Sequence, residues 1–572
     1  MMKDLTSALY QAAELTPERQ LYSFLGSNGE KQNLTNSELL KAAQFFAEIF
    51  TKLTHENDII VLSLKPSLKF IELTFGCILA KRTFLPVYPM RSPHDIARTQ
   101  ALLNKIPAAL IVTDFPYKEK DKALFRCPVI PFYELEGLPA TKKNSRLELE
   151  IEKEDHPIFL QASSGTTRGP RAIIINSEAL MACLQNMQEA LSLSYQDIGS
   201  SWLPPYHDMG LIGAIFLPLF ADFPVYLMKP SSFAHNPMSW IQALSDYQVS
   251  VTAAPNFAYD LCCSRFLTDS PKEIDLSHLR RIVNSAEMLR SKTLHRFYDT
   301  FKPYGLKWDA ITPAYGLAEA TLMGTSNPLN QGPCIRSFSR DALHEGVAKE
   351  CPISETNGID LTSSGKPIKN MDCIIVDRET LLECQPYNIG EIWVKGSSLT
   401  SGYFYDEQGT KYVYTSVSDE LSHQVAYVRT GDTGFMDKQG YLFVTGRLKD
   451  TIKTAHGLVS AEEIEEIVDQ SLGFDALYAT AALMLADQDK TEIVVLKEVP
   501  RGDSYTAHAQ LIYEHIRKLT AVRINKVVFV RQGQIPRTTS GKIKRHVAIV
   551  LFKYNLLEVS AIKSFSEESL IH

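Results

Sequence analysis

The 572-residue sequence lacks basic runs and uninterrupted apolar segments, which argues against nucleic acid and membrane as partners. Its formal net charge is −7 and no stretch concentrates Lys and Arg, so no nucleic-acid footprint is expected. The N-terminus, from Met1 to Asp4, leads into a mixed polar stretch rather than the apolar core of a signal peptide. Residues 210–228 are apolar but contain Asp222 and two prolines. We expect a buried helix and a core strand there, no transmembrane segment, and a cytoplasmic location.

Two further absences narrow the kinds of site. The nine cysteines lie between Cys77 and Cys384 without a CxxC pair, so neither a disulfide framework nor a zinc site is expected. No GxxxxGK[ST] pattern occurs, which argues against a Walker-type phosphate loop. The cysteines are therefore expected to be reduced, buried thiols of a cytosolic protein.

The chain is long enough for more than one hydrophobic core. At 572 residues and 45% hydrophobic content, at least two domains are expected. A capping-box pattern from Thr35 to Glu38 predicts the start of a helix. Beyond it, helical and strand periods alternate, which predicts a parallel, helix-covered sheet. The expected strands are 58–64, 84–88 and 108–113, and the expected helices are 70–81 and 95–105.

The second half of the chain changes in texture. Residues 365–446 read as short strands and turns, which predicts a compact β-rich subdomain. The tail after Gly446 has its own alternation of helix and strand. We therefore expect an α/β fold, with a large N-terminal domain of helix-covered sheets plus the β-rich subdomain at residues 1–447. A hinge would join it to a small α+β C-terminal domain at residues 448–572.

A loop rich in small hydroxyl residues lies between two strand-like runs. Residues 163–171 read Ser-Ser-Gly-Thr-Thr-Arg-Gly-Pro-Arg. Backbone amides and hydroxyls in such a loop can surround a phosphate chain. A Ser/Thr/Gly-rich turn taken alone is more often an ordinary turn.

This loop resembles the phosphate loop of the adenylate-forming superfamily, which comprises acyl-CoA synthetases, luciferases and peptide-synthetase adenylation domains. Five more motifs of that superfamily follow in the expected order across about 380 residues. They are Asn284-Ser285-Ala286-Glu287, Ala314-Tyr315-Gly316-Leu317-Ala318-Glu319, Tyr427-Val428-Arg429-Thr430-Gly431-Asp432, Gly446-Arg447-Leu448-Lys449-Asp450, and residues 536–545 around Lys542. Each alone could be a turn or a core residue, but unrelated turns have no reason to follow one family's order.

The resemblance implies a site for ATP and Mg²⁺. The implied ATP-binding residues are Ser163, Ser164, Gly165, Thr166, Thr167, Ser285, Ala286, Glu287, Ala314, Tyr315, Gly316, Asp432 and Arg447. Tyr315 would stack on the adenine and Asp432 would accept hydrogen bonds from the ribose. Glu319 and Thr167 would hold the metal, Lys542 would be the catalytic lysine, and Lys449 would be the pivot of the hinge.

The chemistry explains these residue types. A carboxylate that attacks the α-phosphorus of ATP brings several negative charges together, so cations must offset them. Mg²⁺ and the ammonium of Lys542 would supply positive charge, and Glu319 would act with them in catalysis. No protein nucleophile is needed.

Several segments resemble fatty acyl-AMP ligases more than acyl-CoA synthetases. Residues 201–210 and 254–262 are similar to motifs of that branch, and Arg168 stands where most of the superfamily has glycine. The resemblance implies an acyl site formed by His207, Asp208, Met209 and Gly210, with apolar walls from Met209, Leu211, Ile212 and Phe216. His207 and Asp208 could instead be the metal-binding pair of a phosphohydrolase, and His207 could be a structural core histidine.

One insertion and two departures qualify the resemblance. The stretch 319–365 is long and contains residues 327–333 and 341–347, which are separated from any strongly periodic element. It resembles the insertion that is implied to hinder domain rotation in acyl-AMP ligases, and a surface excursion is the alternative. Arg171 replaces the superfamily's lysine at the end of the phosphate loop. Residues 453–459 also depart from the usual pattern, which fits either poor use of coenzyme A or loss of the thiol-transfer half-reaction.

The expected function is ATP-dependent activation of a fatty acid to acyl-AMP, with release of pyrophosphate and transfer of the acyl group to a carrier protein thiol. No carrier motif is recognised in the chain, so we expect an acyl carrier protein supplied in trans. The alternatives are a fatty acyl-CoA synthetase and a non-catalytic nucleotide-binding relative. An amino-acid adenylation domain is less favoured, because no acidic residue for an α-amino group is evident.

Overall fold

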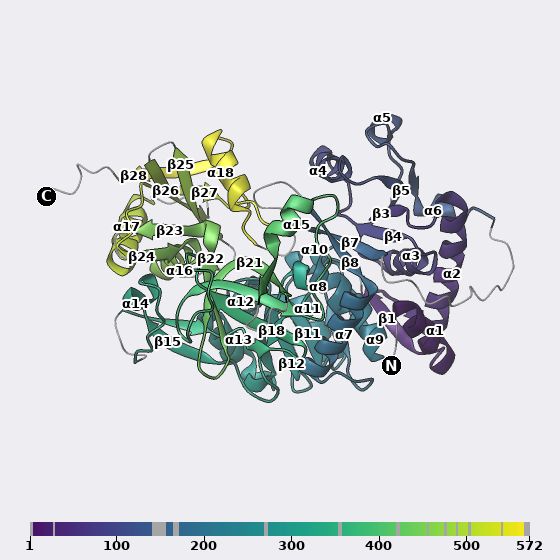
Figure 1. The fold of residues 1–572 in the computed structure, drawn as a ribbon, viewed down its shortest axis with the longest axis horizontal. Helices are drawn as coiled ribbons and strands as arrows, with labels where there is room; N and C mark the ends of the chain where they lie inside the picture. Colours follow the sequence, from purple (N-terminus) through teal and green to yellow (C-terminus); the bar gives the residue numbers. More distant parts are fainter. Residues whose placement is uncertain are drawn as a thin grey trace.

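The computed structural model describes residues 4–26, 29–139, 156–163, 171–267, 273–352, 357–418, 424–454, 457–473, 478–487, 490–500, 505–538 and 542–565. The N-terminal elements lie at one end of the molecule and the C-terminal strands and helices gather at the other (Figure 1). The expected α/β architecture is confirmed, since helices and several sheets form both parts.

The first sheet has six strands and contains the strands expected in the first half of the chain. All neighbours pair in parallel except the last two, which are antiparallel. The order is β6 (Val129–Pro131), β5 (Ala108–Thr113), β3 (Ile59–Ser63), β4 (Thr83–Pro86), β7 (Pro157–Ser163) and β8 (Arg171–Asn176). The predicted phosphate loop runs in sequence from the end of β7 to the start of β8, and its residues 164–170 lie outside the described residues.

The second sheet has nine strands and forms the centre of the molecule. Its order is β17 (Lys366–Pro367), β14 (Thr325–Ser326), β13 (Ile311–Tyr315), β12 (Arg281–Ser285), β11 (Val251–Pro255), β9 (Gly199–Ser201), β10 (Val225–Met228), β1 (Gln20–Leu25) and β2 (Lys31–Thr35). The strands from β13 to β1 are parallel. Ser285 and Tyr315 therefore end neighbouring strands at the same edge, where ligands bind in open α/β sheets.

Local signals account for the first helices. The helix α2 (Asn36–Leu53) begins with the predicted capping box, since Thr35 and Glu38 bond reciprocally to each other's backbone. The expected helix at 70–81 is α3 (Leu68–Leu79), and that at 95–105 is α4 (Pro93–Leu103).

The apolar stretch 210–228 is a buried helical segment followed by a core strand, as predicted. It comprises α8 (Asp208–Leu211), a π-helical turn η1 (Ile212–Phe216), α9 (Leu217–Ala221) and β10. No helix in the described part of the chain is long and apolar enough to cross a bilayer.

The β-rich subdomain is present as five antiparallel strands. They are β18 (Met371–Val376), β19 (Gly390–Gly396), β20 (Tyr414–Ser418), β21 (Gln424–Met436) and β22 (Leu442–Arg447).

The C-terminal part has a hairpin and a four-stranded sheet with helices. Its elements are β23 (Thr451–Thr454), β24 (Gly457–Ser460), α16 (Ala461–Leu472), β25 (Thr480–Asp487), β26 (Lys490–Val499), α17 (Thr506–Thr520), β27 (Lys526–Arg531), α18 (Arg545–Lys553) and β28 (Val559–Ser564). Two core clusters consist only of residues from Ile452 onward, and the other clusters stop at Val444. Among the described residues, each core cluster thus lies on one side of Arg447.

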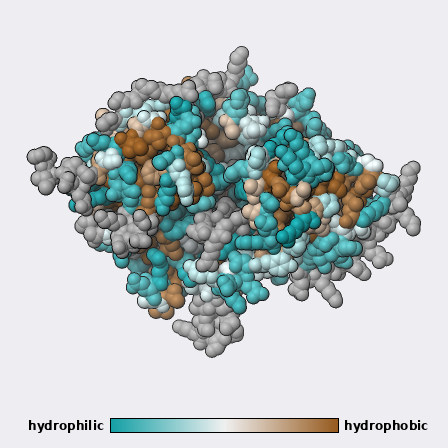
Figure 2. Space-filling model, turned by 90° about the horizontal axis from the view of Figure 1, so that it is seen from above, coloured by the Kyte–Doolittle hydropathy of each residue, from teal (hydrophilic) through white to brown (hydrophobic). Residues whose placement is uncertain are grey.

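The surface seen from above is mostly hydrophilic (Figure 2). Apolar groups form patches on both halves of this face. In the C-terminal part, the exposed side chains Val550, Leu556, Val559 and Ile562 belong to α18, β28 and the turn between them. Two of these side chains, Val559 and Ile562, lie on β28, which is an edge strand of the four-stranded sheet.

The segment 319–365, predicted from the sequence to be an insertion, contains regular secondary structure in its described residues. It contains β14, β15 (Ile335–Ser339), α14 (Arg340–His344) and β16 (Gly358–Thr362), and β15 pairs antiparallel with β16. The helix α14 lies against the C-terminal hairpin. A Cβ on Gly457 would lie 1.9 Å from the carbonyl oxygen of His344, so this contact requires glycine.

Candidate active site

A cavity of about 420 Å³ lies between the N-terminal part and the C-terminal part of the chain. Residues of all five motifs downstream of the phosphate loop line it, although those motifs span more than 250 residues of sequence. The predicted site residues on its wall are Ala286, Glu287, Ala314, Tyr315, Gly316, Asp432, Arg447, Lys449 and Lys542. The structure thus brings the motifs together in one site.

The two central strands deliver the first wall of this cavity. Ala286, directly after β12, has a φ of 73°, a left-handed conformation that is uncommon for a residue other than glycine. This turn aims Glu287 at α12 (Asn256–Phe266), where the backbone N–H of Phe257 donates to Oε2 of Glu287 at 3.0 Å. Burial raises the pKa of Glu287. A Cβ on Gly316 would lie 1.7 Å from the carbonyl oxygen of Leu322, so Gly316 is required by packing.

Asp432 connects two other predicted residues. The hydroxyl of Tyr315 donates to Oδ2 of Asp432 at 2.8 Å, and Nε of Arg447 lies 2.9 Å from Oδ1. Burial raises the pKa of Tyr315 well above its ordinary value, so its hydroxyl remains a donor. Each carboxylate oxygen has more than one lone pair, so Asp432 can still accept from a further donor.

Lys542 lies on a tight loop before α18. The N–H of Thr538 donates to the carbonyl of Lys542 at 2.7 Å, and the N–H of Lys542 donates to the hydroxyl of Thr538 at 3.0 Å. Arg545 fixes the start of α18 through ion pairs with Asp450, Glu462 and Glu465. These contacts tie the lysine loop to the predicted hinge and to α16.

The charges around Lys542 perturb its ionisation. Burial lowers the pKa of Lys542, and the neighbouring Arg447 lowers it further. The carboxylates of Asp432, Asp208 and Glu287 oppose this shift. Lys542 is therefore a buried cation near three anions that come from separate motifs.

His207 and Asp208 form a contact at the start of α8. Nδ1 of His207 lies 2.6 Å from Oδ1 of Asp208. Burial alone would raise the pKa of Asp208, but His207, the N–H of Met209 and Lys542 hold it below its ordinary value. The described residues include no group of three or more His, Cys, Asp or Glu side chains that could hold a metal. The phosphohydrolase alternative therefore lacks its further ligands in the described part of the chain.

A second, apolar cavity of about 70 Å³ adjoins the first. Both cavities have Ala314, Tyr315 and Gly316 in their walls, so they meet at the end of β13. The other walls come from α7 (Ser177–Leu191), the segment 209–218 and strands β9 to β12. An apolar chain in this cavity would place its polar end at the nucleotide side.

The apolar wall differs from the one expected from the sequence. Met209 lines the cavity as predicted, but Gly213, Ala214 and Leu217 form the rest of the helical wall instead of Leu211, Ile212 and Phe216. The ring of Phe216 packs against Phe75, Phe84 and Phe159 in the core. A Cβ on Gly210 would lie 2.1 Å from the carbonyl oxygen of Pro204, so Gly210 lets the chain fold back over the segment 203–204.

The end of the phosphate loop is linked to Glu319. Ser163 ends β7, whereas Ser164, Gly165, Thr166, Thr167 and Arg168 lie outside the described residues. Nε of Arg171 lies 3.0 Å from Asp406, and its guanidinium lies 4.7 Å from the ring centre of Tyr403. The hydroxyl of Tyr403 donates to Oε1 of Glu319 at 2.7 Å. No local sequence pattern indicates Tyr403 or Asp406.

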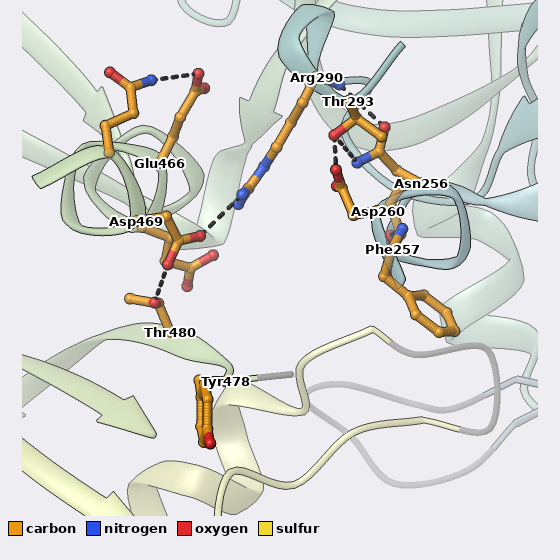
Figure 3. Close-up of polar contacts among 12 residues, drawn as sticks. Asn256, Phe257, Asp260, Arg290, Thr293, Glu466, Asp469, Tyr478 and Thr480 are labelled. Atoms are coloured by element: carbon orange, nitrogen blue, oxygen red, sulfur yellow. Dashed lines mark hydrogen bonds and ion pairs between the residues drawn. The ribbon is translucent and has the colours of Figure 1, made fainter. Parts of the chain in front are cut away.

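The far wall of the polar cavity carries an ion pair between the two parts of the chain (Figure 3). NH1 of Arg290, which precedes α13 (Ser291–Phe301), lies 2.9 Å from Oδ2 of Asp469 in α16. Asp469 also lies 3.0 Å from Nζ of Lys497. On the same wall, burial raises the pKa of Asp260 to about 6, although the hydroxyl of Thr293 donates to it at 2.6 Å.

Comparison with known proteins decides the family. The model of the AMP-binding enzyme family matches residues 9–404. The chain belongs to the AMP-binding enzyme family. The medium-chain-fatty-acid [acyl-carrier-protein] ligase JamA of Moorena producens (strain JHB) is 31% identical over 564 residues, which cover 96% of this chain and 94% of that relative.

Solved structures resemble this AMP-binding enzyme along nearly its whole length. One of the fatty acyl-adenylate ligases studied from E. coli and L. pneumophila has a TM-score of 0.84 and 25% identity, covering 97% of this chain and 98% of that one. The L. pneumophila ligase in complex with acyl adenylate and pyrophosphate has a TM-score of 0.73 and 25% identity, with 98% of both chains covered. The expected superfamily is thus confirmed.

The AMP-binding enzyme therefore gathers most, but not all, predicted residues at one place. Ser285 and Met209 line the apolar cavity, and Glu319 lies beside Tyr403. The remaining described ATP residues except Ser163 line the polar cavity. His207, Asp208 and Gly210 line neither of the two cavities. Sequence reasoning missed Arg290 and Asp469, because residues 179 positions apart leave no local pattern.

Proposed function

We propose that the protein activates a fatty acid with ATP and passes the acyl group to an acyl carrier protein supplied in trans. The observation that carries this proposal is the junction of an apolar cavity with a polar cavity at Ala314, Tyr315 and Gly316. A chain bound in the first cavity meets a nucleotide bound in the second. Two kinds of similarity support the same reaction. One relative is named a medium-chain-fatty-acid [acyl-carrier-protein] ligase, and the similar solved structures are fatty acyl-adenylate ligases.

In the first step, an oxygen of the fatty acid carboxylate attacks the α-phosphorus of ATP. A bond forms between these atoms, the bond to the β-phosphate oxygen breaks, and pyrophosphate leaves with its electron pair. The ammonium of Lys542 would stabilise the negative charge that gathers at the α-phosphate. Asp432 would bind the ribose hydroxyls, and Tyr315 would lie against the adenine.

The described donor set fits a hard divalent cation. Mg²⁺ binds oxygen ligands, often one or two carboxylates together with phosphates of the substrate. Glu319 offers a carboxylate, and its bond with Tyr403 occupies only one of its oxygens. Bound Mg²⁺ would offset phosphate charge, and Glu319 with Thr167 would hold it. Ser163, Ser164, Gly165, Thr166 and Thr167 would surround the β- and γ-phosphates.

In the second step, the thiol of the carrier attacks the acyl carbonyl, a thioester forms and AMP leaves. We propose that residues 448–572 move about Lys449 as a C-terminal domain, with residues 1–447 as the N-terminal domain, so that Lys542 withdraws and the thiol enters. The separation of the core clusters at Arg447 supports this boundary.

A cytoplasmic location is also proposed. All nine cysteines lie within the described residues and all are free thiols. Free thiols are typical of a reducing compartment.

The test is a panel of fatty acids and amino acids with ATP, read as acid-dependent pyrophosphate exchange. Product formation is then followed by mass spectrometry with coenzyme A or with a phosphopantetheinylated carrier protein. The proposal expects exchange with fatty acids and acylation of the carrier. Efficient acyl-CoA production would assign a fatty acyl-CoA synthetase, and no exchange with any acid would assign a non-catalytic nucleotide-binding relative.

A further inference from the structure

The strand register fixes the depth of the apolar cavity. Val251, Gly199 and Val225 pair side by side on β11, β9 and β10 and line its deep end. Ser285, at its mouth, pairs with Pro255, which lies four residues beyond Val251 on β11. Four residues of a strand rise about 13 Å, so this is the length of the cavity along the sheet.

A closed floor ends the cavity at that depth. Phe223 and Leu191 are each 2% exposed, and both line the deep end. A Cβ on Gly199 would lie 3.0 Å from the ring of Phe223 and 3.2 Å from Cγ2 of Val225. These side chains are packed in contact, so a longer chain could pass the floor only by displacing core residues.

The length and the volume set two bounds on the occupant. An extended alkyl chain, with C–C bonds of about 1.5 Å in a zigzag, advances about 1.25 Å per carbon, so about ten carbons fill 13 Å. A cavity of about 70 Å³ holds about five or six water-sized groups, and a methylene group is of similar size. Met187, Met209 and Met323 line the walls, and methionine adapts its shape readily. The bounds are therefore about six and about ten carbons.

Gly213 keeps the middle of the cavity open. It lies in the π-helical turn η1 and lines the apolar cavity. A Cβ built on Gly213 would meet only Cδ2 of Leu322 within 4 Å, at 3.9 Å. A larger side chain at this position would therefore project into free space rather than into packed atoms.

We propose that the apolar cavity selects straight acyl chains of about six to ten carbons, an inference that rests on the proposed fatty acid activation. Gly213 leaves room for the chain in the middle of the cavity, and Phe223 and Leu191 set the maximum chain length. Longer acids must leave apolar carbons outside the cavity or disrupt the floor. Shorter acids leave the floor uncovered and lose apolar contact.

The experiment measures kcat/KM for acyl-AMP formation by the full-length protein with the even-numbered acids from butanoic to hexadecanoic. The optimum is expected at octanoic or decanoic acid, with at least about a tenfold lower value for hexadecanoic acid, since misfit of a few methylene groups in an apolar pocket costs at least that factor. In Gly213→Leu the optimum is expected to move to butanoic or hexanoic acid, with decanoic acid about a hundredfold worse. Gly213→Ala should give a smaller shift in the same direction.

The matched control is Gly137→Ala at the end of α6 (Phe132–Glu136), where a Cβ would meet nothing closer than 3.5 Å. It should leave the chain-length profile unchanged. Hexadecanoic acid used as well as decanoic acid by the unaltered protein would overturn the limit, and an unchanged profile in active Gly213→Leu would overturn the role of Gly213. Failure with every acid would instead overturn the proposed activation itself, and the chain-length inference with it.

Discussion

Replacing Lys542 with alanine tests the centre of the proposed chemistry. Its ammonium is buried near Asp432, Asp208 and Glu287, so its removal leaves three carboxylates to repel the incoming phosphates. A unit charge about 4 Å from an opposite charge contributes about 4 kcal/mol at an effective dielectric constant of about 20. At about 1.36 kcal/mol per tenfold change, Lys542→Ala is expected to lower kcat/KM for fatty-acid-dependent pyrophosphate exchange about a thousandfold.

Lys544 provides a matched control for this measurement. Lys544 lies two residues after Lys542, and burial lowers its pKa as well. Its charged neighbours are Arg98 and Asp95, and Lys544 does not line the polar cavity. Lys544→Ala should therefore retain exchange within about threefold, because it removes a lysine without removing charge from the site. Urea unfolding of both variants checks that the fold is kept. Exchange by Lys542→Ala within tenfold of the unaltered protein would refute the assignment of Lys542.

Three further changes follow from the same contacts. Burial lowers the pKa of Lys542, so the rate of adenylation should decline as pH rises through a value below 10.5. Lys542→Arg should move this alkaline limb of the pH–rate profile to higher pH. A limb that stays in place would belong to another group. Glu463→Gln removes the negative charge that pairs with Arg340, whose side chain is only 6% exposed. The free energy of unfolding in urea titrations should therefore fall by about 3 kcal/mol. An unchanged unfolding midpoint would show that the pair does not stabilise the fold. Arg171→Ala should reduce pyrophosphate exchange about fivefold, because it removes the ion pair with Asp406 and the stacking on Tyr403. Arg171→Lys should reduce exchange less. Unaltered exchange in both variants would show that Arg171 takes no part in adenylation.

Signals that act within one turn or one strand were sufficient to predict much of the fold. The capping box at Thr35 and Glu38 formed as expected, because both partners lie within four residues. The strand at 108–113 has the predicted bounds. The helix expected from Asp95 begins at Pro93, a shift that the cap Ser92 and the proline at the first helical position could have indicated.

Features that depend on distant contacts were not predictable. The resemblance implies that Leu211, Ile212 and Phe216 line the acyl site, but these three residues do not line the apolar cavity. The π-helical turn changes the register, and the packing of Phe216 decides which face points to the core. Arg290 and Asp469 are 179 positions apart in the sequence, so no local pattern predicts their ion pair.

The ion pairs between the N-terminal and C-terminal parts bear on the proposed movement of the C-terminal part. Arg290 with Asp469, and Arg340 and His344 with Glu463, cross a boundary that the core clusters of the described residues do not span. Parting an apolar interface exposes surface that water does not solvate well, whereas separated charges recover hydration. The boundary is thus suited to the domain movement that we propose for each turnover.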